Sequence, residues 1–118
     1  MTIVNSMSSD VLNRLELVYL AIIPAIKNFP KDQKYTLGEN IDQALLGAIR
    51  DFFTASYDKR VRENALIHLR GQLHETVFLI RVAFKLKFLS NALYEKFTKE
   101  LVEIGKIISS WIKKGNMG

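Results

Sequence analysis

Cysteine is absent from this sequence of 118 residues. Its absence excludes disulfide bonds, thiolate catalysis and zinc sites built on cysteine. Glycine and proline are also scarce, with six and two residues respectively. The glycines are isolated or terminal, so the sequence offers no glycine-rich loop that could hold a phosphate. The scarcity of both residues, with charges spread along the chain, argues against intrinsic disorder.

Long apolar runs are missing as well. The longest extends from Val18 to Ile26, whereas a membrane-spanning helix needs about 20 apolar residues. The segment from Met1 to Asp10 is polar and lacks the positive start and apolar middle of a signal peptide. We therefore expect no membrane-spanning segment and a cytoplasmic location.

Groups that could carry catalysis or bind a metal are few and badly placed. His68 and His74 are the only histidines, and their separation of six residues puts them on different sides of a helix. His68 and Glu75 share a side, but they lie about 10 Å apart along a helix axis. The carboxylates are scattered, and most stand beside a lysine or an arginine. We expect no catalytic residue, no metal site, no cofactor and therefore no enzyme.

The residues that are present suit one helical domain with an excess of positive charge. Hydrophobic residues make up 48% of the chain, which allows a core to form, and the formal net charge is +5. The length fits a single domain over residues 1–118. The positive charge favours an acidic partner: nucleic acid, an anionic membrane surface or an acidic protein. Of these we expect nucleic acid and protein, and no membrane.

Hydrophobic periodicity predicts four helices, at about 9–28, 36–56, 58–87 and 90–113. Pro24 should kink the first helix or loosen one of its turns. No strand-like alternation and no internal repeat is present. Three short connections between long helices force neighbouring helices to run antiparallel. The predicted fold class is all-α, an antiparallel up-down-up-down four-helix bundle.

Polar residues mark where these helices should begin. Ser9 or Asp10 is the expected cap of the first helix. Thr36 and Glu39 have the spacing of a capping box, in which a hydroxyl and a carboxylate each bind a free backbone N–H. Asp58 is the expected cap of the third helix.

The third helix is apolar on two nearly opposite faces. The first face suits the bundle core and consists of Leu66, Leu69, Leu73, Ile80 and Phe84. The second face holds Ile67, Phe78 and Val82, with Gly71 among them. A helix in a monomeric bundle should be polar there, so this face predicts contact with another subunit or a partner. The alternative is a few scattered surface hydrophobics.

A basic stripe lies between these two faces. Arg70, His74, Arg81 and Lys85 fall within a narrow sector of the helix, and Lys87 extends the positive run into the next connection. Such a line of cations suits contact with a nucleic-acid backbone. The alternative is a solvated rim in which Arg81 pairs with a carboxylate of another helix. Three further lysines are lesser candidates for the same contact: Lys106, Lys113 and Lys114.

Three segments carry a resemblance to a known family. The run from Phe29 to Ile41 resembles the "FP-x-x-x-(K/R)-(Y/F)-x-LG-x-x-I" signature between the first two helices of the accessory variability determinant family. The segment from Leu79 to Leu86 is similar to the family's "LLRLAxxL" pattern. The segment from Ile104 to Lys113 is similar to "IG-(K/R)-x-x-GGW-(L/I)-K", with Ser109 and Ser110 in place of the two glycines. Together the three segments extend over about residues 12–113.

The resemblance implies a function as well as a fold. Members of this family are accessory proteins of diversity-generating retroelements, and they are four-helix bundles that assemble as homopentamers. They bind the reverse transcriptase and the template RNA of the element and support mutagenic cDNA synthesis, without enzymatic activity of their own. This resemblance implies a homopentamer that binds a reverse transcriptase and RNA or DNA.

Two alternatives stay open. Proteins encoded by intervening sequences in large-subunit ribosomal RNA genes are similar in fold, but they carry an "R-A-x-x-S-I-x-x-N-I-A-E-G" run that residues 41–50 lack. The resemblance therefore favours the retroelement family. The other alternative is a purely structural scaffold whose oligomer presents a surface to one protein.

Overall fold

The structure, a computed structural model, describes residues 6–118 and is all-helical over that range. Four long helices form it: α1 (Ser6–Lys27), α3 (Glu39–Tyr57), α4 (Arg62–Lys85) and α5 (Asn91–Lys114). Short helical segments connect them: α2 (Lys31–Gln33) and η1 (Lys34–Gly38) before α3, and η2 (Lys59–Val61) before α4.

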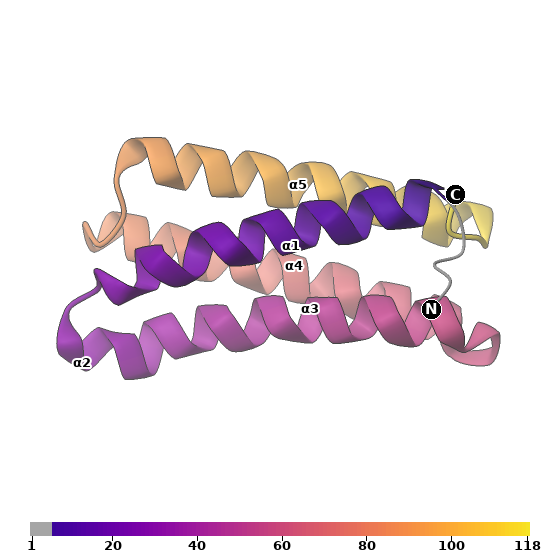
Figure 1. The fold of residues 1–118 in the computed structure, drawn as a ribbon, viewed down its shortest axis with the longest axis horizontal. Helices are drawn as coiled ribbons and strands as arrows, with labels where there is room; N and C mark the ends of the chain where they lie inside the picture. Colours follow the sequence, from indigo (N-terminus) through magenta and orange to yellow (C-terminus); the bar gives the residue numbers. More distant parts are fainter. Residues whose placement is uncertain (1–5) are drawn as a thin grey trace.

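The long helices lie lengthwise beside one another in a body of 42 × 23 × 23 Å (Figure 1). Helix α4 packs against α3 and α5, and α1 packs against the same two helices. The chain turns from α1 into α3 and from α4 into α5 at one end, and from α3 into α4 at the other (Figure 1). This arrangement is consistent with a four-helix bundle. Among the described helices, none is long and apolar enough to cross a membrane.

The core comes from the apolar stripes that periodicity predicts. Every third or fourth residue of α5 is buried, from Phe97 to Trp111, and α1 contributes Leu15, Val18 and Ile22. Side chains beside these stripes, such as Leu12 and Ile23, are half-buried and pack against the core from its edge. Burial of apolar area on one stripe of each helix is the main force that holds the four together.

Pro24 does not interrupt helix α1. The proline lies in the last turn of the helix and is exposed, and α1 continues through it to Lys27. The helix also begins earlier than expected, because the turn from Ser6 to Ser9 is already helical.

The predicted capping box at Thr36 and Glu39 is wrong. Helical structure already begins at Lys31, after Pro30, so Thr36 lies inside the π-helical segment η1 instead of at a helix start. The Thr36 hydroxyl donates to the Asp32 carbonyl and to the Gln33 side chain, at 3.3 and 3.0 Å. It therefore does not cap a backbone N–H.

Gly38 explains why the chain can pass so close to α1 at this point. A Cβ built on Gly38 would lie 2.6 Å from Cγ2 of Ile26, which is closer than carbon atoms approach without displacement. The wide π turn and the missing side chain bring the start of α3 against the end of α1.

Asp58 and Ser90 accept backbone hydrogen bonds at helix starts, as their residue types favour. Asp58 accepts from the Arg60 N–H at 3.0 Å, which caps η2, and α4 follows at Arg62. The hydrogen bond from the Arg60 side chain to the carboxylate lowers the pKa of Asp58. Ser90 accepts from the Leu93 N–H at 3.2 Å and caps α5.

Candidate nucleic-acid interface

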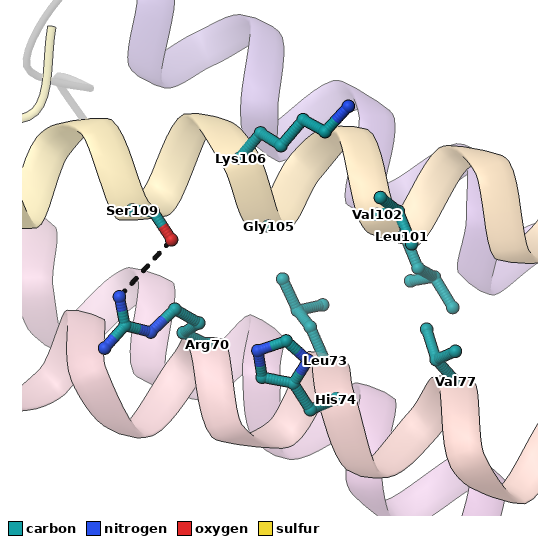
Figure 2. A pocket seen from close by; sticks show the side chains of 9 residues that line it. All are labelled: Arg70, Leu73, His74, Val77, Leu101, Val102, Gly105, Lys106 and Ser109. Atoms are coloured by element: carbon teal, nitrogen blue, oxygen red, sulfur yellow. Dashed lines mark hydrogen bonds between the residues drawn. The ribbon is translucent and has the colours of Figure 1, made fainter.

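Arg70 and His74 point from α4 toward α5 and line a groove between these helices (Figure 2). The groove has a volume of about 320 Å³. Its apolar lining is contributed by Leu73 and Val77 of α4 and by Leu101 and Val102 of α5. No aspartate or glutamate lines it within the described part of the chain. The groove therefore joins an apolar wall to a basic edge.

Arg70 is partly buried, and an Nη atom donates to the Ser109 hydroxyl at 3.3 Å (Figure 2). This is its only side-chain hydrogen bond within residues 6–118, and no carboxylate pairs with it there. A guanidinium has five N–H donors in a planar fork, which suits a phosphate or a carboxylate. Arg70 therefore has donors free for an anion.

Gly105 keeps the groove open on the side of α5. A Cβ built there would meet nothing within 4 Å, so this glycine does not serve close helix packing. Figure 2 shows the Leu73 side chain extending from α4 toward Gly105, with the His74 ring beside α4. Sequence reasoning missed the roles of Gly105 and Ser109, because they lie on a helix far along the chain from Arg70.

Lys106 lines this groove with part of its side chain, but its charged end lies outside. Its ammonium extends along the far side of α5, away from Arg70 and His74 (Figure 2), and forms an ion pair of 3.6 Å with Glu103. Exposed pairs of this kind contribute little to stability. The structure thus brings Arg70 and His74 together and leaves the charge of Lys106 outside the groove.

The rest of the predicted basic stripe lies elsewhere on α4 and beyond it. Arg81 is exposed, and its guanidinium carbon lies 5.8 Å from the centre of the Phe78 ring, a cation–π distance. No carboxylate pairs with Arg81 among the described residues. Lys85 and Lys87 are exposed and line a separate hollow at the turn into α5.

Lys87 lies in the connection after the helix, as the sequence indicated, although α4 ends two residues earlier than its approximate predicted bound. Helix α4 ends at Lys85, and Lys87 has a left-handed backbone with φ of 68°. Backbone hydrogen bonds from Lys87 N–H to the Phe84 carbonyl and from Phe88 N–H to the Ala83 carbonyl close the helix end. The chain therefore leaves the helical path at Lys87.

Lys113 and Lys114 occupy the last turn of α5 and are exposed. Their charges complement the negative end of the helix dipole. Gly115 follows in the left-handed conformation, with φ of 77°. The end of α5 that carries them lies at the opposite end of the molecule from the turn between α4 and α5 (Figure 1).

The predicted oligomer residues are accessible to different degrees in the single chain. Ile67 and Phe78 are 43% and 53% exposed, and Val82 is half-buried. Leu17 and Leu20 of α1 are more exposed, at 66% and 62%, and border a second groove against α5. Sequence reasoning did not identify these two leucines, because they lie just outside the core stripe of an otherwise apolar helix.

Two polar pairs that join α1 to its neighbours lie apart from the groove between α4 and α5. Arg14 Nε donates to Glu100 Oε1 at 2.7 Å and joins α1 to α5. The Tyr19 hydroxyl donates to Asp42 Oδ1 at 2.7 Å and joins α1 to α3, and this hydrogen bond raises the pKa of Tyr19. Within the described range, no three His, Cys, Asp or Glu side chains gather as they would around a metal ion.

Comparison with known families gives a match over nearly the whole chain. The model of the family described as bAvd-like matches residues 11–115. Comparisons with curated proteins and with solved structures found no match.

Proposed function

The chain belongs to the bAvd-like family, and from this membership we propose that it is a non-enzymatic accessory protein of a diversity-generating retroelement. It binds the reverse transcriptase of the element and its RNA or cDNA, and so supports mutagenic cDNA synthesis. It works in the cytoplasm as a single-domain, antiparallel up-down-up-down bundle that assembles as a homo-oligomer, a pentamer by analogy with the family. The family match over residues 11–115 carries this proposal.

The distribution of charge supports nucleic-acid contact. Arg70, Arg81, Lys85 and Lys87 have no carboxylate partner within the described residues. Cations that are not neutralised by the protein can release the counterions of a phosphate backbone, and this release drives sequence-independent binding. The net charge of +5 acts in the same direction.

Matched charge reversals test whether binding is located at these residues. A Lys85→Glu/Lys87→Glu variant should bind structured RNA more weakly than the parent and with a shallower dependence on salt. A Lys59→Glu/Lys99→Glu variant changes the net charge equally at two exposed positions outside the predicted set, and it should bind nearly as the parent does. Gel-shift titrations at several salt concentrations measure both.

Three outcomes distinguish the proposal from its alternatives. Equal losses in the two variants would mean that overall charge alone attracts RNA. Absence of RNA and DNA binding by the parent at physiological salt would favour a purely structural scaffold. The genes beside the coding sequence separate the two families: a reverse transcriptase and imperfect repeats support the retroelement, whereas a ribosomal RNA gene supports the intervening-sequence alternative.

A further inference from the structure

We propose that the groove between α4 and α5 holds one unstacked nucleotide, which makes the protein prefer single-stranded nucleic acid over a duplex. This inference rests on the proposed function and adds to it a ligand and a place. The backbone phosphate meets Arg70, and the base enters the apolar space between His74 and Gly105 (Figure 2).

The proposed phosphate subsite is argued from the burial and the hydrogen-bond partners of Arg70. Its guanidinium is partly buried at the groove edge, has a hydroxyl as its only side-chain hydrogen-bond partner among residues 6–118, and faces no acidic lining residue. A half-buried cation without a counter-charge gains most from an anion that brings its own acceptor oxygens. The Ser109 hydroxyl beside it is a second possible donor to the same phosphate.

The base subsite follows from the shape and lining of the groove. Leu73 and Leu101 are buried at its base, and Val102 remains 42% exposed at its edge. The His74 ring is exposed and lines the groove from α4 (Figure 2). Unpaired bases stack on histidine rings and on arginine planes in proteins that bind single strands. A paired base cannot enter, because it is held inside the duplex stack.

The size of the groove favours a nucleotide over a protein segment. Its volume of about 320 Å³ is at the lower end of sites that take small molecules, which begin near roughly 300 Å³. A helix with its side chains is about 10–12 Å across and could only lie on the rim. A flat ring with one attached anion matches both the volume and the single basic edge.

A Gly105→Leu variant fills the groove without changing charge. A Cβ at this position meets nothing within 4 Å, and leucine is a better helix former than glycine, so the fold is retained. The control is Thr54→Leu, which adds the same side chain at an exposed position of α3, away from the groove. Both variants are titrated with a single-stranded RNA oligonucleotide and with an RNA duplex of the same length.

We expect Gly105→Leu to weaken single-strand binding about tenfold, the order expected for one stacked base, and to leave duplex binding unchanged. Thr54→Leu should change neither. Parental single-strand affinity in Gly105→Leu overturns the groove proposal, as does an equal loss toward both forms. Loss of reverse-transcriptase binding with RNA binding intact would assign the groove to a protein segment instead.

The charge reversals described above keep the two proposals separate. If Lys85→Glu/Lys87→Glu weakens RNA binding while Gly105→Leu does not, the proposed function stands and the groove proposal fails. If the parent binds neither form of RNA, the proposed function itself fails.

Discussion

At the scale of the residue, Lys87 has a backbone conformation that costs stability. It has a positive φ of 68°, the one such residue other than glycine among residues 6–118. A Cβ atom makes this backbone unfavourable by roughly 1–2 kcal/mol, because it lies too close to the following carbonyl oxygen. Glycine has no Cβ, and helices commonly end with glycine at such a position. A lysine there is consistent with a role for its charge at the turn into α5.

Lys87→Gly should therefore raise the free energy of unfolding by about 1 kcal/mol while it weakens RNA binding. Urea denaturation measures the first effect and a gel-shift titration the second. Lys87→Ala is the control, because it removes the charge and keeps the Cβ. Equal stability of the glycine and alanine variants would contradict the backbone explanation.

The Tyr19 hydroxyl should make the stability of the protein depend on pH. Its hydrogen bond to Asp42, with burial as the second cause, raises the pKa of the phenol. Because the pKa is raised in the folded state, the hydrogen bond contributes fully to stability below the ordinary phenol pKa, about 10. This contribution to stability is lost as pH rises through the pKa of the folded state. Tyr19→Phe should cost about 1 kcal/mol at neutral pH, and the difference from the parent should shrink in alkaline solution.

Thermal unfolding of the parent and of Tyr19→Phe, at neutral pH and above pH of about 10, checks this prediction. Tyr35→Phe is the control, because Tyr35 is 73% exposed. A difference between parent and Tyr19→Phe that stays constant with pH would show that the hydroxyl contributes through packing alone.

At the scale of the element, helix packing decides whether a glycine can be replaced by a larger residue. A Cβ at Gly38 would lie 2.6 Å from Ile26 Cγ2, and a Cβ at Gly47 would lie 2.5 Å from Gln72 Nε2. A Cβ at Gly71 or Gly105 meets nothing within 4 Å. The same residue type thus permits contact between helices at two positions and leaves open surface at two others.

Gly38→Ala and Gly71→Ala should consequently have opposite effects. Gly38→Ala should lower the free energy of unfolding by about 1–3 kcal/mol, because the methyl group must displace Ile26. Gly71→Ala should raise it by up to about 1 kcal/mol, the difference in helix propensity. Chemical denaturation of the two variants tests this, and a stabilised Gly38→Ala would refute the close approach of η1 to α1.

At the scale of the whole molecule, the single chain leaves large apolar side chains on its surface. Leu17, Leu20, Ile67 and Phe78 are all more than 40% exposed. Exposed apolar groups that gather in one contiguous patch are typical of surfaces that meet another chain. Of the residues predicted for the oligomer contact, Phe78 is the most exposed, and the Arg81 guanidinium lies over its ring.

Phe78→Asp should dissociate the oligomer and leave each subunit folded, because Phe78 is exposed in the isolated chain. Light scattering gives the mass, and circular dichroism reports the fold. Tyr35→Asp, at another exposed aromatic, should leave the mass unchanged. A parent that is monomeric at micromolar concentration, or a Phe78→Asp variant with the parental mass, contradicts the proposed interface.

The sequence by itself determined the helical class, the approximate extent of the long helices and most of the core. These properties depend on contacts within three or four residues, and the stripe from Phe97 to Trp111 is a direct example. The sequence also predicted a basic stripe along the third helix. The sequence did not predict the short helical segments α2 and η1 before α3. Their path depends on the close approach of Gly38 to Ile26, which is a contact between two elements.

Only the tertiary structure decided which cations lie close together. Arg70 and His74 share a groove with Gly105 and Ser109, whereas the ammonium of Lys106 turns toward Glu103, and Lys85 and Lys87 lie at a different hollow. Packing also buries Met117, whose carbonyl accepts from the Ser8 hydroxyl at 3.0 Å. Such neighbours are far apart in the sequence, so the rotation of one helix against another decides which side chains meet. Periodicity within one helix does not specify that rotation.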